Sequence, residues 1–310
     1  MAERGALSKQ REDEGMRQIS PKMEPIPGLQ LHLGETTVWS VAESVLYFTC
    51  VEDEPELLRW DPKSGVVTRW PMPERIGGYV LKEGGGALVV LASGLYDFDF
   101  ASGSLELRVK NPLEGVALHE PACDPSGRLW VGSIDLSLTI ANPRRGNAKF
   151  FRLEGNELVP VLEHVGCANG LAISQDGRYL YFADSVSRGS LRFDLDVKTG
   201  AITNPKQLFE LRADEPGYPD GATLDAEGGY WVALVGAGKL RRYLPDGTLD
   251  AEIKLPVSNP TKVSFGGPGF RTMFLTSCRL ELGPALTDAD GRLYKFDPGV
   301  AGFAEPLFRG

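Results

Sequence analysis

The sequence DPSGRLWVGS, residues 124–133, is the clearest copy of a module that recurs along the whole chain. The module is a glycine turn followed by a strand rich in aromatic and β-branched residues. Three other stretches show it well: SQDGRYLYFADS (174–185), DAEGGYWVALVG (225–236) and GGPGFRTMFLTS (266–277). Two weaker copies are AESVLYFTCV (42–51) and EGGGALVVLAS (83–93). Short apolar runs that follow tight turns are typical of buried strands.

The turns of the six copies are about 40 to 50 residues apart, which is the period expected of a four-stranded propeller blade. A second signature follows in most copies, where an apolar strand runs into a tight turn: LLRWDPKSG (57–65), LRFDLDVKTG (191–200) and LYKFDPG (293–299). Asp, Pro and Gly in these turns favour hairpins. The sequence therefore predicts an all-β protein, a six-bladed β-propeller with four-stranded antiparallel blades around a central tunnel. We find no convincing amphipathic helix.

The chain has 310 residues, of which 42% are hydrophobic and 24% charged, with 37 Gly and 22 Pro, as suits a fold made of many turns. We expect one propeller domain over residues 29–310. Residues 1–28 are expected to be a disordered tail or a tag remnant, since residues 1–22 are polar and nearly free of large apolar groups. A propeller must seal its ring, and we expect residues 29–33 to pair with the last blade, residues 293–308.

The net charge of −9 and the scattered basic residues argue against nucleic acid as a partner. The sequence contains neither an apolar run of about 18 residues nor a signal-peptide core, so we expect no membrane partner. Four cysteines occur without a CxxC pair, which indicates reduced thiols in a cytoplasmic protein: Cys50, Cys123, Cys167 and Cys278. The expected state is a monomer or a homodimer.

Propeller blades place the start of their innermost strand around the central tunnel, so residues at that place in each blade converge. The candidates at this position are Glu35 in blade one, His119 and Glu120 in blade three, Asn169 in blade four, Asp220 in blade five, and Asn259 or Thr261 in blade six. A search for a functional site therefore begins with these side chains.

Glu35, Asn169 and Asp220 are the most informative of these candidates. They offer two carboxylates and one amide oxygen, which are the hard donors that Ca²⁺ or Mg²⁺ prefers, and too few to fill a shell of about six to eight ligands. The remaining positions would admit water and substrate. Each residue also has a simpler explanation, because Asn169 and Asp220 both precede a glycine in a dipeptide typical of turns. Their matching place in separate repeats favours the metal site.

The sequence is similar to a family of six-bladed propellers that includes gluconolactonase, regucalcin (senescence marker protein) and diisopropyl-fluorophosphatase. The resemblance spans roughly residues 33–308. It depends on LGETTVW (33–39), NGLAISQDGRYLYFADS (169–185), YPDGATLDAEGGYWVAL (218–234) and NPTKVSFGGPGFRTMFLTS (259–277). It implies one divalent cation, held by Glu35, Asn169 and Asp220, with Ca²⁺ as the first choice and Mg²⁺, Mn²⁺ or Zn²⁺ as alternatives. It also implies hydrolysis of a small lactone or ester.

Three pocket positions depart from the family pattern. Where many sugar lactonases carry Arg-x-Asn-Asp, this chain has Ala117 in place of the arginine, His119 in place of the asparagine, and Glu120. An acid that binds substrate in some members aligns near Ser137, and Asp135 lies close to it. We therefore expect His119, Glu120 and Asp135 to bind substrate, with Glu120 as an extra metal ligand as an alternative.

The expected function is that of a metal-dependent lactonase or esterase, a carboxylic-ester hydrolase. The cation would polarise the carbonyl, and Asp220, His119 or both would assist the attack of water. An ordinary histidine pKa of about 6.5 suits that role, although a lone histidine beside a turn is often structural. Two alternatives stay open: a phosphotriester or fluorophosphate hydrolase of the same fold, and a non-enzymatic calcium-binding propeller.

Overall fold

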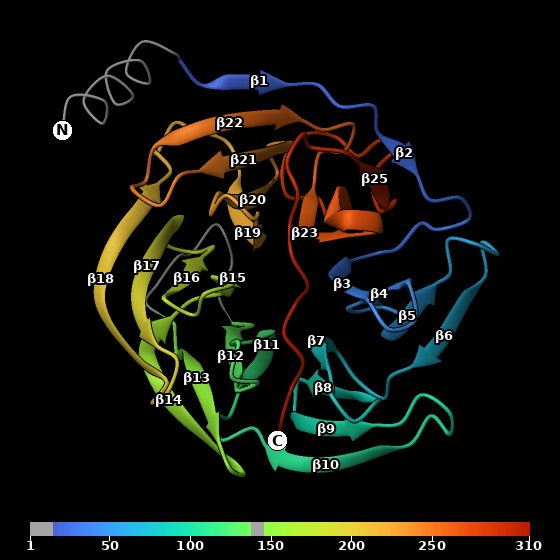
Figure 1. The fold of residues 1–310 in the computed structure, drawn as a ribbon, viewed down its shortest axis with the longest axis vertical. Helices are drawn as coiled ribbons and strands as arrows, with labels where there is room; N and C mark the ends of the chain where they lie inside the picture. The colour runs from blue at the N-terminus through green and yellow to red at the C-terminus, as the bar shows by residue number, and fades with distance from the viewer. Residues whose placement is uncertain (1–14, 138–145) are drawn as a thin grey trace.

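The computed structural model describes residues 15–137 and 146–310, and these residues form six antiparallel sheets around a central axis (Figure 1). The predicted six-bladed propeller is confirmed. The blades are numbered here in chain order, and in each blade the first strand lies next to the axis.

Each blade has four strands that run outwards from the axis. Blade one holds β3 (Gly34–Ser40), β4 (Val45–Cys50), β5 (Glu56–Trp60) and β6 (Val67–Pro71). Blade two holds β7 (Ile76–Leu81), β8 (Ala87–Leu91), β9 (Gly94–Phe98) and β10 (Leu105–Lys110). Blade three holds β11 (Val116–Cys123), β12 (Leu129–Asp135), β13 (Ala148–Glu154) and β14 (Glu157–Val165).

The second half of the ring repeats this order. Blade four holds β15 (Ala168–Ile173), β16 (Tyr179–Asp184), β17 (Gly189–Asp196) and β18 (Ala201–Glu210). Blade five holds β19 (Tyr218–Leu224), β20 (Tyr230–Val235), β21 (Lys239–Tyr243) and β22 (Leu249–Lys254). Blade six holds β23 (Pro260–Gly266), β24 (Thr272–Ser277), β25 (Tyr294–Phe296) and the N-terminal strand β2 (Glu24–Pro25).

A hydrogen bond inside the repeated module explains its sequence. In blade three the carboxylate of Asp124 accepts the indole N–H of Trp130 (3.2 Å), and in blade five Asp225 accepts the indole N–H of Trp231 (2.7 Å). Both carboxylates also accept backbone N–H groups of their own turns. Both tryptophans are fully buried. The aspartate thus ties the turn to the strand that follows it, and satisfies a polar group that burial would otherwise leave unpaired.

The pairing of the first two strands of every blade is interrupted by one extra residue on the inner strand. The register shifts follow Glu35, Ile76, His119, Asn169, Pro219 and Pro260. Such β-bulges bend the strand and re-aim side chains. All six lie near the start of the inner strand, so they turn side chains towards one end of the tunnel.

The N-terminal segment seals the ring. Strand β2 pairs antiparallel with β25, the backbone N–H of Leu31 donates to Gly291 (2.7 Å), and Leu33 forms a bridge with Cys278. The expected contact of residues 29–33 with the last blade is therefore present, and the pairing begins earlier, at Glu24.

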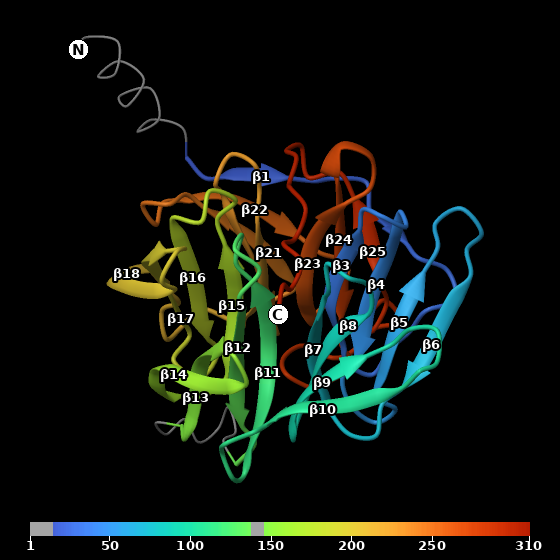
Figure 2. The same cartoon turned by 60° about the horizontal axis from the view of Figure 1, so that its bottom comes forward.

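The predicted disordered tail of residues 1–28 is wrong in its last part. Besides β2, strand β1 (Arg17–Ile19) pairs in parallel with β22 on the outside of blade five (Figures 1 and 2). The polar composition of this segment is explained by its place, since an edge strand exposes most of its side chains. Residues 1–14 lie outside the described part of the chain.

The C-terminal segment, residues 297–310, crosses the ring near its centre (Figure 1). Its backbone bonds to residues at or beside the hairpin turns between first and second strands in four blades, at Ala226, Phe270, Leu81 and Gly127. Those turns lie at the ends of the inner strands opposite to the bulges. The segment therefore covers the end of the tunnel that faces away from the bulged ends.

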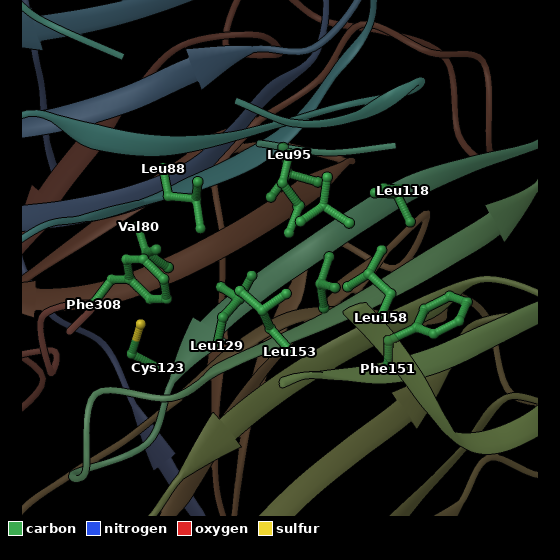
Figure 3. Close-up of a cluster of buried hydrophobic side chains, with 13 residues drawn as sticks. Val80, Leu88, Leu95, Leu118, Cys123, Leu129, Phe151, Leu153, Leu158 and Phe308 are labelled. Atoms are coloured by element: carbon green, nitrogen blue, oxygen red, sulfur yellow. The ribbon is translucent and has the colours of Figure 1, made fainter. Parts of the chain in front are cut away.

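Phe308 anchors this segment. Its side chain is 4% exposed and belongs to the apolar cluster between blades two and three, where it lies beside Val80 (Figure 3). In the described part of the chain the helical content is one short 3₁₀ turn, Pro268–Phe270, as expected. No described helix has the length and apolar character needed to cross a membrane.

Removal of residues 1–33 should destabilise the whole protein, because it opens the ring and exposes the edge of β25. Removal of residues 1–22 keeps β2 and should lower the melting temperature only slightly, through the loss of β1. Thermal melts of the two truncations test this difference. Equal melting temperatures would contradict ring closure by β2 and the segment that follows it.

Phe308→Ala should lower the free energy of unfolding by about 3 to 5 kcal/mol, because it empties a well-packed site. The neighbouring Leu307 is 39% exposed, so Leu307→Ala should change stability by no more than about 0.5 kcal/mol. Urea unfolding of both variants, followed by tryptophan fluorescence, measures the difference. If Phe308→Ala unfolds at the same urea concentration as Leu307→Ala, the C-terminal segment is not an anchor.

Candidate active site

A cavity of about 430 Å³ opens at the bulged end of the inner strands. The sequence analysis assigns a role in binding metal or substrate, or in catalysis, to six residues. Five of these six line the cavity: Glu35, His119, Asp135, Asn169 and Asp220. The larger apolar side chains of the lining come from blades three to six and the segment before blade one: Leu33, Ile134, Val186, Tyr218, Val235, Leu280 and Leu282. The ring thus gathers residues that are far apart in the sequence into a single cavity.

Glu35 and Asp220 are buried carboxyl groups, 3% and 9% exposed. Burial raises the pKa of Glu35 to about 8, and the charge of Glu120 adds to the effect. Burial, followed by the charges of Glu35 and Glu120, raises the pKa of Asp220 well above its usual range. Lys262 opposes the rise at both groups, and Arg75 opposes it at Glu35, yet both pKa values stay raised. A cation between the two carboxyl groups would supply the further positive charge that favours their ionised forms.

The amide of Asn169 is held in one orientation. Its Nδ2 donates to Ser185 Oγ (2.9 Å), and that hydroxyl in turn donates to the carbonyl of Pro219 in blade five (2.6 Å). Asn169 Oδ1 is buried and has no hydrogen-bond partner among the described residues. An acceptor left unpaired beside two carboxylates suits a metal ligand, because a cation would satisfy it.

The bulge that presents Asn169 depends on the glycine after it. Gly170 has φ +59°, and a Cβ there would lie 2.3 Å from Tyr230 Oη. Tyr230 uses that close approach to donate a hydrogen bond to the carbonyl of Gly170 (2.7 Å). Asn169-Gly170 is a dipeptide typical of turns, but here it forms a β-bulge. The hydrogen bond from Tyr230 of the neighbouring blade holds this bulge in place.

Glu35, Asn169 and Asp220 therefore fit a hard divalent cation. No three His, Cys, Asp or Glu side chains gather as a metal site within residues 15–137 and 146–310, so the candidate set depends on the amide oxygen as its third ligand. The roles of the three residues as metal ligands stay predictions.

His119 lies in the cavity but does not have an ordinary histidine pKa. Burial lowers the pKa of His119 to about 3, and the positive charges of Arg75 and Lys262 add to the effect. The ring is therefore neutral at neutral pH and a weak proton acceptor. This pKa lies below the ordinary value on which the expected proton-transfer role was based, and a catalytic role of His119 stays a prediction. A neutral imidazole can still donate one hydrogen bond and accept another.

Glu120 is absent from the cavity wall and forms a buried ion pair. Its carboxylate binds Lys262 Nζ at 2.7 Å, deeper in the tunnel. Burial alone would lower the pKa of Lys262, but the charge and hydrogen bond of Glu120 raise it. Another acid, Glu305 of the C-terminal segment, lies near Glu120 and Lys262. Burial raises the pKa of Glu305. The expected contact of Glu120 with substrate stays a prediction, and its ion pair favours a structural role.

Asp135 lines the cavity as a turn-capping residue. Its Oδ1 accepts the N–H and hydroxyl of Ser137, and its Oδ2 accepts the N–H of Asn147. The hydrogen bonds from Ser137 and Asn147 lower the pKa of Asp135. The aspartate is therefore ionised at neutral pH. Binding of substrate by Asp135 stays a prediction.

The blade-six candidates do not reach the cavity. Thr261 Oγ1 donates to the carbonyl of Gly34 (2.5 Å), and Asn259 Nδ2 donates to the carbonyl of Leu280 (2.8 Å). Both residues are fully buried. Thr261 therefore joins blade six to blade one, and Asn259 joins the start of blade six to the loop that follows β24.

The structure adds a cavity residue that the sequence search did not include. Arg75 lies directly before β7 in blade two, at the same place as the candidates in the other blades, and lines the cavity. The signal was present in PERIGGYV, residues 73–80, at the start of an inner strand. No candidate was named in blade two, where the side chain at this position is the cation Arg75.

Comparison with known proteins agrees with this architecture. Residues 33–279 match the model of the family described as SMP-30/Gluconolactonase/LRE-like region. A 6-deoxy-6-sulfogluconolactonase of Pseudomonas putida is 37% identical over 287 residues, which cover 90% of this chain and 95% of that protein. An L-arabinolactonase of Azospirillum brasilense is 31% identical over 285 residues, covering 90% and 92%.

A crystal structure of a calcium-binding protein, regucalcin, from Agrobacterium tumefaciens has the same fold. It superposes with a TM-score of 0.86 at 24% identity, covering 96% of this chain and 100% of that one. The family model and the two relatives each extend over most of the propeller. The chain therefore belongs to the SMP-30/gluconolactonase/LRE-like family.

Proposed function

We propose that the protein is a hydrolase that opens a small lactone with the help of one divalent cation. The observation that carries this proposal is the pair of buried carboxyl groups with raised pKa, Glu35 and Asp220, in one cavity with the unpartnered amide oxygen of Asn169. The lactonase names of the two relatives support the reaction class. Three hard oxygen donors favour Ca²⁺, with Mg²⁺ next.

A bound cation would supply a Lewis acid that polarises the ester carbonyl. Asp220 is the candidate general base, because it lines the cavity and a carboxylate that gives one oxygen to a cation can turn the other towards an attacking water. His119, being neutral, would orient the substrate through hydrogen bonds. The apolar wall of the cavity would limit the access of bulk water. A volume of about 430 Å³ suits a small ring such as a lactone.

Glu35→Gln and Asp220→Asn should each lower kcat/KM for lactone opening by at least about 100-fold, because each removes a charge from the cation site. EDTA should abolish activity in the wild type, and added Ca²⁺ should restore it. Glu106→Gln is the matched control, since it makes the same change at an exposed residue of β10. A pH-stat assay over a lactone panel measures the rates.

Two results would count against this function. Activity that survives exhaustive chelation would remove the cation from the mechanism. Binding of Ca²⁺ without turnover on sugar, non-sugar and aromatic lactones would instead favour a non-enzymatic calcium-binding propeller.

The stabilisation by Ca²⁺ should depend on pH. In the cation-free protein Glu35 and Asp220 hold their protons more tightly when folded than when unfolded, so stability falls as pH rises from 4.5 to about 8. A bound cation keeps both groups ionised and removes this loss. The rise in melting temperature on adding Ca²⁺ should therefore be larger at about pH 8 than at about pH 5.

Thermal melts with EDTA or CaCl₂ across this range test the prediction. Glu35→Gln should reduce both the fall of stability with pH and the effect of Ca²⁺. A Ca²⁺ effect of the same size at every pH would show that these carboxyl groups do not bind the ion.

A further inference from the structure

In the described part of the chain, five cavity side chains converge from the starts of the inner strands. Arg75 is the positively charged one. Blades one, three, four and five contribute Glu35, His119, Asn169 and Asp220 at this position, and blade two contributes Arg75. The positive charge of Arg75 acts on two of these side chains. It lowers the pKa of His119 and opposes the rise in the pKa of Glu35. Arg75 therefore lies close to the proposed reaction centre.

The guanidinium of Arg75 is incompletely paired. Its side chain is 16% exposed, and its Nε makes one long contact with Glu52 Oε2 (3.4 Å). Arg75 Nη1 is buried and has no hydrogen-bond partner in the described residues. A buried charged donor without an acceptor is costly, and an oxygen of a bound ligand would satisfy it.

A second guanidinium adds to the positive charge of the cavity. Arg188 also lines it, and its donors bind the backbone carbonyls of Arg212, Glu215 and Gly217. It stacks over the ring of Tyr218 at 5.3 Å. It forms no ion pair with a described acid, so its charge is not locally neutralised.

The charges of the cavity therefore favour an anion once the cation site is filled. Glu35 and Asp220 are then occupied by the metal, and Asp135 is saturated by its own turn. The two arginines remain. The facing wall offers mainly aliphatic groups, which cannot pair with sugar hydroxyls: Leu33, Ile134, Val186, Val235, Leu280 and Leu282.

Blade three supplies no positive charge to the cavity from Ala117. Ala117 stands where many lactonases of the family carry an arginine in blade three. Ala117 is buried and is not part of the cavity wall. In this chain the arginine comes from the adjacent blade two, so it approaches the substrate from a different direction.

We propose that Arg75 is a specificity-determining residue that binds an acidic substituent of the lactone, a carboxylate, phosphate or sulfonate remote from the ring ester. Arg188 strengthens the field that attracts it. This inference rests on the proposed function. Arginine suits the role because its planar fork pairs with two oxygens of such a group.

The test compares two lactones that differ only in the terminal group: glucono-γ-lactone, with a neutral CH₂OH, and glucaro-γ-lactone, with a carboxylate. Arg75→Ala should lower kcat/KM for the acidic lactone by about 10- to 100-fold, the range for losing a charge-assisted hydrogen bond, and for the neutral one by less than about threefold. Arg75→Lys keeps the charge and should retain part of the preference.

Arg271→Ala is the matched control. It removes the same charge from an exposed ion pair with Asp297, outside the cavity, and should leave both rates unchanged. Equal losses on both lactones in Arg75→Ala would overturn the proposal, because they would place Arg75 on the ester carbonyl or in the structure. Parallel assays with lactones that carry a phosphate or sulfonate identify the preferred acid.

A binding measurement separates this proposal from the proposed function. Calorimetry with Ca²⁺-loaded protein should show glucarate binding at least about tenfold more tightly than gluconate, and Arg75→Ala should remove the difference. Equal affinities in the wild type would overturn the anion site even if lactones are hydrolysed. A clear preference for glucarate without turnover of any lactone would support the site and refute the hydrolase.

Discussion

The extra residue at the start of every inner strand is the constraint on which the cavity depends. A regular strand would send successive side chains to alternate faces, into the contacts between blades. The bulge breaks that alternation at the same level in all six blades and turns side chains towards the axis. The repeated hairpins therefore build the ring, while the bulges build the site.

Buried charged side chains lie at successive levels along the tunnel. Glu35 and Asp220 occupy the upper layer, and Glu120 pairs with Lys262 beneath them. Glu305 enters from the far end on the C-terminal segment. Burial and the charge of Glu120 raise the pKa of both Glu35 and Asp220, and the positive charges of Lys262 and Arg75 do not cancel this effect at Glu35. The arrangement of these acids through the tunnel thus supports the proposed cation site.

The sequence predicted the ring well and the site in part. Glycine turns and module spacing are local features, and they were sufficient for six blades. Asn169 and Asp220 could be found because they stand at equal places in repeats. The pair of Glu120 and Lys262 could not, since the residues are 142 positions apart and meet only across the closed tunnel. The early strands β1 and β2 were also hidden, because edge strands with polar side chains resemble a disordered tail.

The path of the last residues also has a consequence for biosynthesis. Phe308 completes the core between blades two and three, which are synthesised well before it. Blade six, in turn, waits for β25 to meet β2. Early blades can begin to fold while later ones are still being made, but the ring cannot close until β25 and the segment up to Phe308 have been synthesised. A nascent chain stalled before Phe308 would expose apolar surface of blades two and three.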